Sequence, residues 1–292
     1  MPRRTASLPR RLAAPARRAV LPLVDAWGSA TGPARALPDF LICGAQRSGT
    51  TSLFKSLCQN PAATGPVLRK GVHFFDTGYD RGTSWYRAHF PLRATLRGRG
   101  GLPRVRAFES SPYYLFHPLA AERIARDLPW ARVVVILRDP VERAYSAHAH
   151  ETARGFETEP FARAVELEEA RLAGEEEKLL ADPGYTSHSH QHHGYVARGH
   201  YADQLERMEK HLGRDRMYVV DYAELFDGTT RQLRRIEDFL GLPSGPDRVP
   251  GRHNARKRTV MPEGLRAELT ERFAESDRRL ARWWGRTPSW CA

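Results

Sequence analysis

The sequence contains no apolar run that approaches the ~18 residues needed for a membrane-spanning helix. Its best apolar stretch, residues 133–137, is short and rich in β-branched residues, which is typical of a buried parallel strand. The three cysteines, Cys43, Cys58 and Cys291, have neither the spacing of metal ligands nor the density of a disulfide framework. We expect Cys43 and Cys58, which lie in apolar stretches, to be small core residues. This cysteine usage favours a reducing compartment, so we expect a cytoplasmic protein.

Acidic residues are almost absent from the first 37 residues, where Asp25 stands alone. Seven arginines lie in the same segment: Arg3, Arg4, Arg10, Arg11, Arg17, Arg18 and Arg35. The net charge of the whole chain is +12, which indicates an anionic partner such as a nucleotide, an acidic glycan, a nucleic acid or a membrane surface. We expect residues 1–37 to form a flexible basic arm. The alternative is that this arm makes peripheral contact with an anionic membrane. A single domain is expected over residues 38–292.

Alternating strand and helix patterns predict an α/β fold, a P-loop-type parallel sheet with helices on both faces. Strands are expected at residues 39–43, 72–75, 104–108, 132–137 and 216–220. Helices are expected at residues 50–59, 117–128, 141–152, 159–180, 201–212, 229–240 and 265–284. The His-rich segment 182–200 and the Pro-rich segment 243–262 are expected to be loops near the carboxyl ends of the strands, where such sheets bind ligands.

The first motif, DFLICGAQRSGTTS at residues 39–52, predicts a phosphate-binding loop. A strand, a turn bounded by glycines and a hydroxyl-rich helix start direct backbone N–H groups and the helix dipole toward an anion. An ATP-type loop requires a lysine after its second glycine, but here Thr50 stands there and Arg47 is the nearby cation. No apolar strand ends in an aspartate suited to Mg²⁺. A P-loop nucleotide kinase is therefore an alternative that this motif disfavours.

The second motif, RVVVILRDPVERAYS at residues 132–146, predicts a second phosphate site. Arg138 ends the strand, and Pro140 suits the first turn of the following helix. Ser146 follows Arg138 by about two helical turns, so the two side chains could hold one phosphate from two sides. The alternative is that Arg138 pairs with a neighbouring carboxylate and Ser146 faces solvent.

Together the two motifs resemble the sulfotransferase superfamily that uses 3′-phosphoadenosine 5′-phosphosulfate (PAPS). The closer similarity is to its glycan branch, which includes the heparan sulfate enzymes and their bacterial relatives. The resemblance extends over residues 39–284 through four further stretches: RKGVHFFD at 69–76, FESSPYYL at 108–115, RGHYADQLERM at 198–208 and HNARKRTVMP at 253–262.

This resemblance implies in-line transfer of a sulfuryl group from PAPS to a hydroxyl or amine of an acceptor, without a metal. The expected acceptor is a carbohydrate or a glycosylated metabolite. The residues that the resemblance places at the 5′-phosphosulfate are Arg47, Ser48, Gly49, Thr50 and Thr51. Those that it places at the 3′-phosphate are Arg138 and Ser146, and the late donor-binding loop would supply Arg256, Lys257 and Arg258.

The proton acceptor does not follow from the resemblance. The glycan branch usually has a glutamate after the lysine of RKGVHFFD, but here Gly71 follows Lys70. In an extended strand Gly71 and His73 face the same side, so we predict that His73 is the base and that Lys70 assists at the bridging oxygen. Glu109 is the rival base, and a structural bond from His73 to Asp76 is the alternative role for the imidazole.

Two features of the sequence, its positive charge and the histidines of residues 188–200, also allow interpretations other than a sulfotransferase. A basic nucleic-acid-binding protein would explain the charge, but neither a helix-turn-helix nor a stacking platform accompanies it, and we expect no nucleic-acid partner. The histidines of residues 188–200 favour a mobile loop on the acceptor side over a zinc site, because they lack a cysteine pair or a helical HxxxH.

Overall fold

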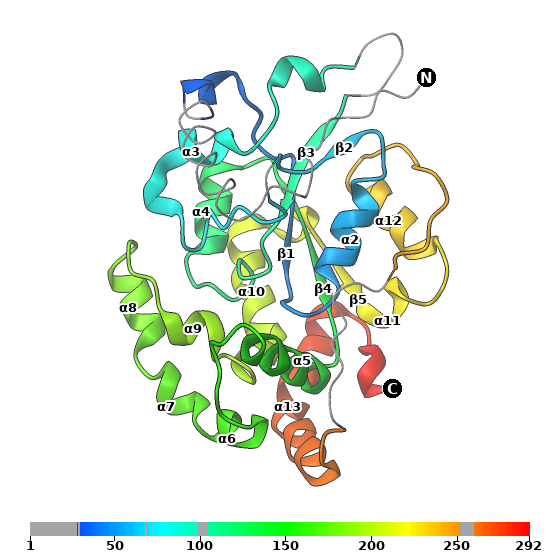
Figure 1. The fold of residues 1–292 in the computed structure, drawn as a ribbon. Helices are drawn as coiled ribbons and strands as arrows, with labels where there is room; N and C mark the ends of the chain where they lie inside the picture. Colours follow the sequence, from blue (N-terminus) through cyan, green and yellow to red (C-terminus); the bar gives the residue numbers. More distant parts are fainter. Residues whose placement is uncertain (1–27, 29, 68, 99–103, 252–259) are drawn as a thin grey trace.

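The computed structural model describes residues 28, 30–67, 69–98, 104–251 and 260–292. They fold around a five-stranded sheet with the order β2-β3-β1-β4-β5, and every pairing in it is parallel (Figure 1). The strands are β1 (Phe40–Gly44), β2 (Ala63–Thr64), β3 (Arg106–Ser110), β4 (Arg132–Leu137) and β5 (Met217–Asp221). The predicted α/β architecture is confirmed.

Helices cover both faces of the sheet because successive strand residues point to opposite sides. Phe40 and Ile42 of β1 pack in one buried cluster, whereas Leu41 and Cys43 pack in the other. The first cluster is closed by α2 (Thr50–Leu57), α11 (Tyr222–Leu225) and α12 (Arg231–Phe239). The second is closed by α4 (Ala120–Asp127), α10 (Tyr201–Leu212) and the end of α13 (Glu263–Trp284).

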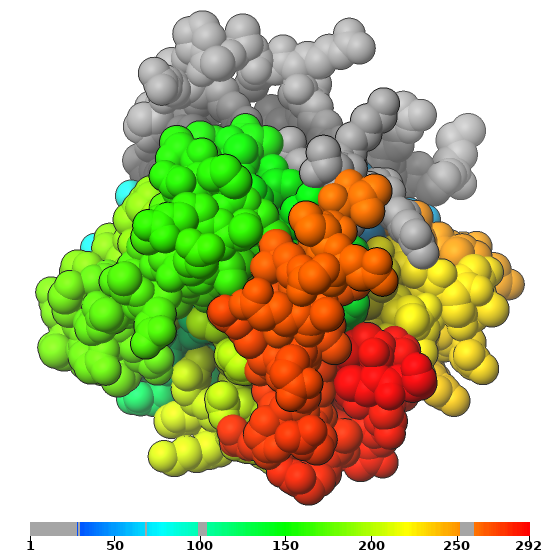
Figure 2. All heavy atoms as spheres, turned by 90° about the horizontal axis from the view of Figure 1, so that it is seen from below, coloured from blue at the N-terminus to red at the C-terminus, as the bar shows by residue number. Residues whose placement is uncertain are grey.

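The remaining helices gather around the carboxyl ends of the strands and at one side of the sheet (Figure 1). They are α3 (Gly82–Ala88), α5 (Pro140–Thr152), α6 (Phe161–Glu166), α7 (Glu168–Leu172), α8 (Glu175–Ala181) and α9 (His188–His192). Short 3₁₀ turns are η1 (Gly32–Ala34), η2 (Tyr79–Arg81), η3 (Arg93–Leu96), η4 (Ala197–Gly199), η5 (Arg214–Arg216) and η6 (Ser289–Cys291). Seen from below, α13 lies beside the C-terminal residues (Figure 2). None of the described helices is long and apolar enough to cross a membrane.

The strand predicted at residues 72–75 is wrong, since these residues form a loop and a turn. Side chains take the backbone donors that a strand would need. The N–H of Val72 donates to Glu109 (2.7 Å), that of His73 to Ser111 (3.0 Å) and that of Phe74 to the Tyr114 hydroxyl (2.9 Å). The strand predicted at residues 104–108 is therefore β3. The two-residue strand β2, at Ala63–Thr64, was not predicted.

Two other predictions from the sequence need correction. The single helix expected at residues 159–180 is three short helices, α6, α7 and α8, and Gly174 enters the last of them with a left-handed φ of 72°. Segment 182–200 is not a free loop, because it contains α9 and its His190 is buried. Cys43 is buried as expected, but Cys58 is exposed because α2 ends at Leu57.

Part of the predicted basic arm packs against the domain. Ala36 donates its N–H to the carbonyl of Pro91 (2.9 Å), and the Arg35 guanidinium donates to the carbonyl of Phe90 (2.7 Å). Residues 1–27 and 29 of the arm lie outside the described residues. Arg35 and Ala36 are thus fixed to the segment that follows α3.

Candidate active site

The loop between β1 and α2 forms the floor of the candidate site. Gly49 caps α2 with a left-handed φ of 90°, and a Cβ there would lie 2.7 Å from the ring of Phe226. Only glycine fits this conformation and this contact. Arg47 also has a positive φ, 70°, two residues earlier. These turns bring the chain to the start of α2, where backbone N–H groups and the helix dipole favour an anion.

Lys70 reaches this loop from the 69–76 segment. Its ammonium donates to the hydroxyl of Thr50 (2.9 Å) and to that of Thr51 (3.1 Å). Burial, and then the charge of Arg47, lower the pKa of Lys70 to about 7, although Glu109 acts in the opposite direction. A lysine from a distant segment thus supplies the cation that an ATP-type loop would carry at the position of Thr50.

The second motif joins the first loop directly. The Arg47 guanidinium donates to the hydroxyl of Ser146 (3.1 Å) in α5, and Arg138 donates to the backbone carbonyl of Arg47 (3.3 Å). Arg138 also pairs with Glu142 (3.1 Å) and lies over the ring of Tyr222 at 5.0 Å. The structure therefore brings Arg47, Arg138 and Ser146 together, while Arg138 keeps the carboxylate partner that the sequence left open as an alternative.

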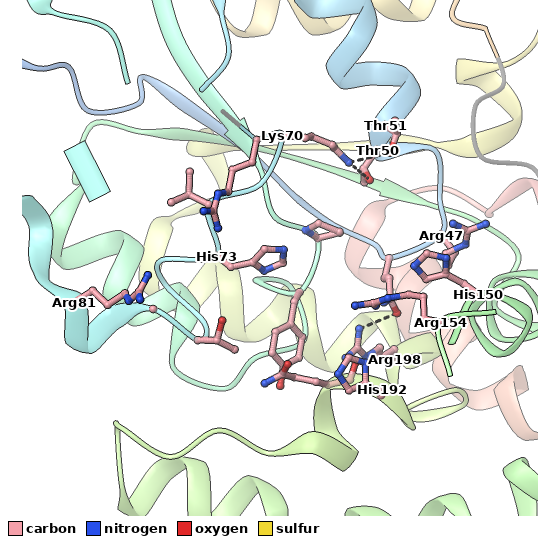
Figure 3. Close-up of a pocket in the computed structure, with 18 of the residues that line it drawn as sticks. Arg47, Thr50, Thr51, Lys70, His73, Arg81, His150, Arg154, His192 and Arg198 are labelled. Atoms are coloured by element: carbon pink, nitrogen blue, oxygen red, sulfur yellow. Dashed lines mark hydrogen bonds between the residues drawn. The ribbon is translucent and has the colours of Figure 1, made fainter. Parts of the chain in front are cut away.

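A cavity of about 540 Å³ opens beside the loop (Figure 3). Five residues of the predicted set line it: Arg47, Thr50, Thr51, Lys70 and His73. Ser48, Glu109, Arg138 and Ser146 do not line this cavity, and the hydroxyl of Ser48 is buried without a hydrogen-bond partner among the described residues. Arg256, Lys257 and Arg258 lie outside the described residues.

His73, which lines the cavity, pairs with Asp76, which does not. The imidazole Nδ1 lies 2.7 Å from a carboxylate oxygen of Asp76, which is buried, while 47% of the His73 side chain is exposed. Burial alone would lower the pKa of His73, but the Asp76 carboxylate outweighs it and raises this pKa above 6.5. None of the other described residues bonds to Nε2, so this nitrogen is available on the cavity side (Figure 3).

The strand argument that first pointed to His73 does not hold, because His73 has a φ of 59° in a turn. Contacts other than strand pairing set the position of His73 next to Gly71. A Cβ at Gly71 would lie 2.6 Å from the carbonyl oxygen of Ser110 and 3.4 Å from Nε2 of His73. The imidazole thus lies at contact distance from position 71, where the bond of the His73 N–H to Ser111 and the bond of Nδ1 to Asp76 hold it.

Glu109 has a different environment from the one expected of a base. It is wholly buried, and its carboxylate accepts bonds from the Val72 N–H (2.7 Å), Ser111 (2.7 Å), Tyr114 (2.7 Å) and Tyr86 (2.8 Å). Burial raises its pKa, although these donors act to lower it. With four donors on its two oxygens, Glu109 holds the loop that carries His73.

Several residues of the cavity wall were missed by the motif search: Arg81, Trp85, Arg154, His192 and Arg198. Arg198 and His192 lay in stretches that had been singled out, RGHYADQLERM and the His-rich segment 182–200, but neither was predicted as a site residue. The others come from α3 and its preceding turn and from the segment after α5, neither of which carries a phosphate-loop pattern. Their common feature is cationic or aromatic character at one cavity, which appears only after folding.

Comparisons with known proteins agree with this geometry. The sulfotransferase domain family matches residues 37–258. A crystal structure of a sulfotransferase from Alicyclobacillus acidocaldarius is 31% identical, with a TM-score of 0.63, and the match covers 87% of this chain and 98% of that one.

Relatives of known description include heparan sulfate enzymes. The bifunctional heparan sulfate N-deacetylase/N-sulfotransferase 1 of Caenorhabditis elegans is 29% identical over 82% of this chain and 29% of its own length. The heparan sulfate glucosamine 3-O-sulfotransferase 3B1 of Mus musculus is 29% identical over 70% of this chain and 46% of its own. The membrane-associated sulfotransferase kil1 of Dictyostelium discoideum is 24% identical over 84% of this chain and 64% of its own. The chain thus spans less than two thirds of these relatives, and from the extent of the family match it belongs to the sulfotransferase domain family.

Proposed function

We propose that the protein transfers a sulfuryl group from PAPS to a hydroxyl or amine of a carbohydrate-containing acceptor. The observation that carries this proposal is the shared cavity of Lys70, Arg47 and His73, in which two cations stand at the anion-binding loop and an imidazole faces them. Membership of the family and the heparan sulfate relatives support the donor and the acceptor class.

In the proposed reaction Arg47 and Lys70 bind the 5′-phosphosulfate together with the hydroxyls of Thr50 and Thr51. A bond forms between the acceptor oxygen or nitrogen and sulfur, while the bond from sulfur to the bridging oxygen breaks. The electron pair goes to that oxygen, where Lys70 and Arg47 stabilise the developing charge. His73 takes the acceptor's proton at Nε2 while Asp76 holds Nδ1–H. Glu109 acts as a positioning residue.

Arg138 and Ser146 are the proposed contacts of the 3′-phosphate. Both already touch Arg47, so a phosphate there would be linked to the 5′ end of the same donor. Binding would require Arg138 to share its guanidinium between Glu142 and the phosphate. Arg256, Lys257 and Arg258 are proposed to complete this side.

A ligand comparison tests the donor. We expect 3′,5′-adenosine bisphosphate to stabilise the protein against thermal unfolding, by about 2.7 kcal/mol at a hundredfold excess over its Kd, and ATP–Mg²⁺ to have little effect. A larger effect of ATP–Mg²⁺ would support a kinase instead. Salt-sensitive DNA binding without nucleotide stabilisation would support the nucleic-acid-binding alternative. Mass spectrometry of acceptors incubated with PAPS then tests transfer itself.

We also propose a cytoplasmic location with peripheral membrane contact through the arginines of residues 1–37. The support is their charge, with a single acid among them, together with the low cysteine content. One similar protein is named a membrane-associated sulfotransferase.

A further inference from the structure

The turn η6, near the end of the chain, is fastened to the sheet by one buried aspartate. Asp221, the last residue of β5, is wholly buried. Its carboxylate accepts bonds from the N–H of Ser289 (2.9 Å) and from the hydroxyl of Ser289 (2.8 Å). It also accepts the N–H of Ala223 (2.8 Å) as the N-cap of α11. One carboxylate therefore holds both η6 and the start of α11, which lie side by side (Figure 1).

The start of α11 supports the guanidinium of Arg138. Tyr222, the residue after the N-cap, lies under this guanidinium with its ring centroid 5.0 Å away. The Tyr222 ring also packs on that of Phe226, with the two centroids 4.6 Å apart. The cap that η6 shares with α11 thus helps to fix the aromatic face on which Arg138 rests.

A second contact leads from η6 to the main chain of Arg138. The indole N–H of Trp290 donates to Asp277 (3.0 Å) in α13, and the indole meets the Tyr201 ring edge-on, with centroids 6.1 Å apart. Tyr201 is wholly buried, and its hydroxyl donates to the carbonyl of Arg138 (2.7 Å). Trp290 therefore packs against the side chain that holds the main chain at Arg138.

These two supports differ from the ion pair of Arg138 with Glu142. That pair (3.1 Å) uses the guanidinium N–H groups, for which a 3′-phosphate would compete. The contacts through Tyr222 and Tyr201 use the ring face and the main-chain carbonyl, so they leave the N–H groups to the phosphate. A side chain that is held in its binding geometry beforehand loses less entropy when the ligand binds.

Resting on the proposed function, we infer that η6 positions Arg138 for the 3′-phosphate of the donor. Ser289 acts through the cap of α11, and Trp290 acts through Tyr201. Both are positioning residues, because each acts through another side chain. Loss of either support should weaken the contact with the 3′-phosphate and spare the 5′ end, whose proposed contacts lie in the loop between β1 and α2.

Two ligands that differ only in the 3′-phosphate test this inference: 3′,5′-adenosine bisphosphate and adenosine 5′-monophosphate. Calorimetry gives both Kd values for each protein, and their ratio measures the contribution of the 3′-phosphate. We expect the wild type to bind the bisphosphate about tenfold or more tightly than the monophosphate. Ser289→Ala and Trp290→Leu should each lower this ratio about threefold or more, through weaker binding of the bisphosphate alone. A smaller folded fraction would weaken both ligands alike and cancel in the ratio.

Two variants serve as controls. Ser289→Thr keeps the hydroxyl and should keep the wild-type ratio. Trp283→Leu is the matched control for Trp290→Leu, because Trp283 also donates its indole N–H to a carboxylate, that of Glu209. Glu209 lies at the far end of α10 from Tyr201, so this substitution should leave the ratio unchanged.

A variant without the positioned side chain separates positioning from a general loosening of the fold. In Arg138→Gln, the further change Ser289→Ala should have no effect on the ratio, whereas loosening would act in both backgrounds. Wild-type ratios in Ser289→Ala and Trp290→Leu, or an equal loss with and without Arg138, would overturn the inference and leave the proposed donor site standing. A wild-type ratio near one would instead contradict the proposed 3′-phosphate site, and the inference with it.

Discussion

One imidazole nitrogen of His73 is tied to Asp76, and the other faces the cavity. This arrangement fixes the tautomer with the proton on Nδ1, so Nε2 is left as the acceptor. Removal of the imidazole should therefore affect proton transfer and not donor binding.

We expect His73→Ala to lower kcat about 10²- to 10⁴-fold, the usual contribution of a general base. The affinity for 3′,5′-adenosine bisphosphate should stay close to that of the wild type, because His73 is not among the residues at the anion-binding loop. Steady-state kinetics and calorimetry measure the two quantities. Near-normal turnover would remove His73 from the mechanism.

The pH dependence of kcat should report the ionisation of His73 in its pair with Asp76. The base must be neutral, so kcat should rise as the pH rises through the pKa of His73, which lies above 6.5 because Asp76 outweighs burial. In Asp76→Asn the raising charge is lost and burial remains, so the rise should move to lower pH while the maximal rate falls. Rate profiles of both proteins measure the shift. A rise at unchanged pH in Asp76→Asn would contradict the assignment.

Lys70 should couple donor binding to proton uptake. Its pKa of about 7 means that part of the lysine is neutral in the free protein near neutral pH, whereas an anionic phosphate favours the ammonium. We expect 3′,5′-adenosine bisphosphate to bind with proton uptake just above pH ~7 and more weakly as the pH rises. Calorimetry in buffers of different ionisation enthalpy measures the uptake. Lys70→Arg is the control, because guanidinium keeps its proton, and unchanged uptake in that variant would exclude Lys70.

At the scale of elements, the loop after Lys70 depends on three side chains from β3 and the segment that follows it. Glu109, Ser111 and Tyr114 accept its backbone N–H groups, although they lie about 40 residues further along the chain. The alternation of KGVHFFD is typical of a strand, and nothing local in the sequence reveals these distant acceptors. His73 lines the cavity, but the extended strand from which its role as the base was predicted is not formed, and that role stays a prediction.

Glu109→Gln should loosen this loop. An amide presents one acceptor oxygen and an N–H₂ group where the carboxylate accepts four bonds, so buried donors lose partners. We expect a loss of about 1–3 kcal/mol in the free energy of unfolding, and a lower kcat with donor affinity retained. Denaturant titration and kinetics measure both. Glu122→Gln, on the exposed side of α4, is the control. A fully stable Glu109→Gln protein that lacks only turnover would instead favour Glu109 as the base.

At the scale of the whole molecule, the parallel sheet followed from the sequence because β1 and β4 are continuous apolar runs, each followed by a clear helix. The turn between β1 and α2 followed from its glycines and hydroxyls, and anion binding there stays a prediction. The other half of the cavity wall did not follow from the sequence, since Arg81, Arg154 and His192 come from three separate elements. Arg81 and Arg154 have an ordinary surface pattern in the sequence, and His192 lies in the His-rich segment that was expected to be a loop. Only the packing of α9 and the α3 region beside the loop between β1 and α2 brings the three to one cavity.

The basic arm is the second feature of the whole molecule that can be tested. We expect the protein to sediment with vesicles containing phosphatidylserine at low salt and to be released at high salt, since each arginine near such a surface contributes about 1 kcal/mol. Replacing Arg3, Arg4, Arg10, Arg11, Arg17 and Arg18 with glutamine should abolish sedimentation. Arg35 is left unchanged because it bonds to Phe90. Vesicles of phosphatidylcholine alone are the control, and binding that survives the substitutions would locate the contact elsewhere.

The crowding around Gly71 limits how this enzyme can diverge. A side chain at position 71 would collide with the Ser110 carbonyl and the Ser111 hydroxyl, so any residue larger than glycine at 71 requires the chain at residues 110 and 111 to move. A substitution at position 71 alone should therefore give a crowded, impaired protein. For the same reason, residues 70–76 and 109–114 should be exchanged between homologues as one module.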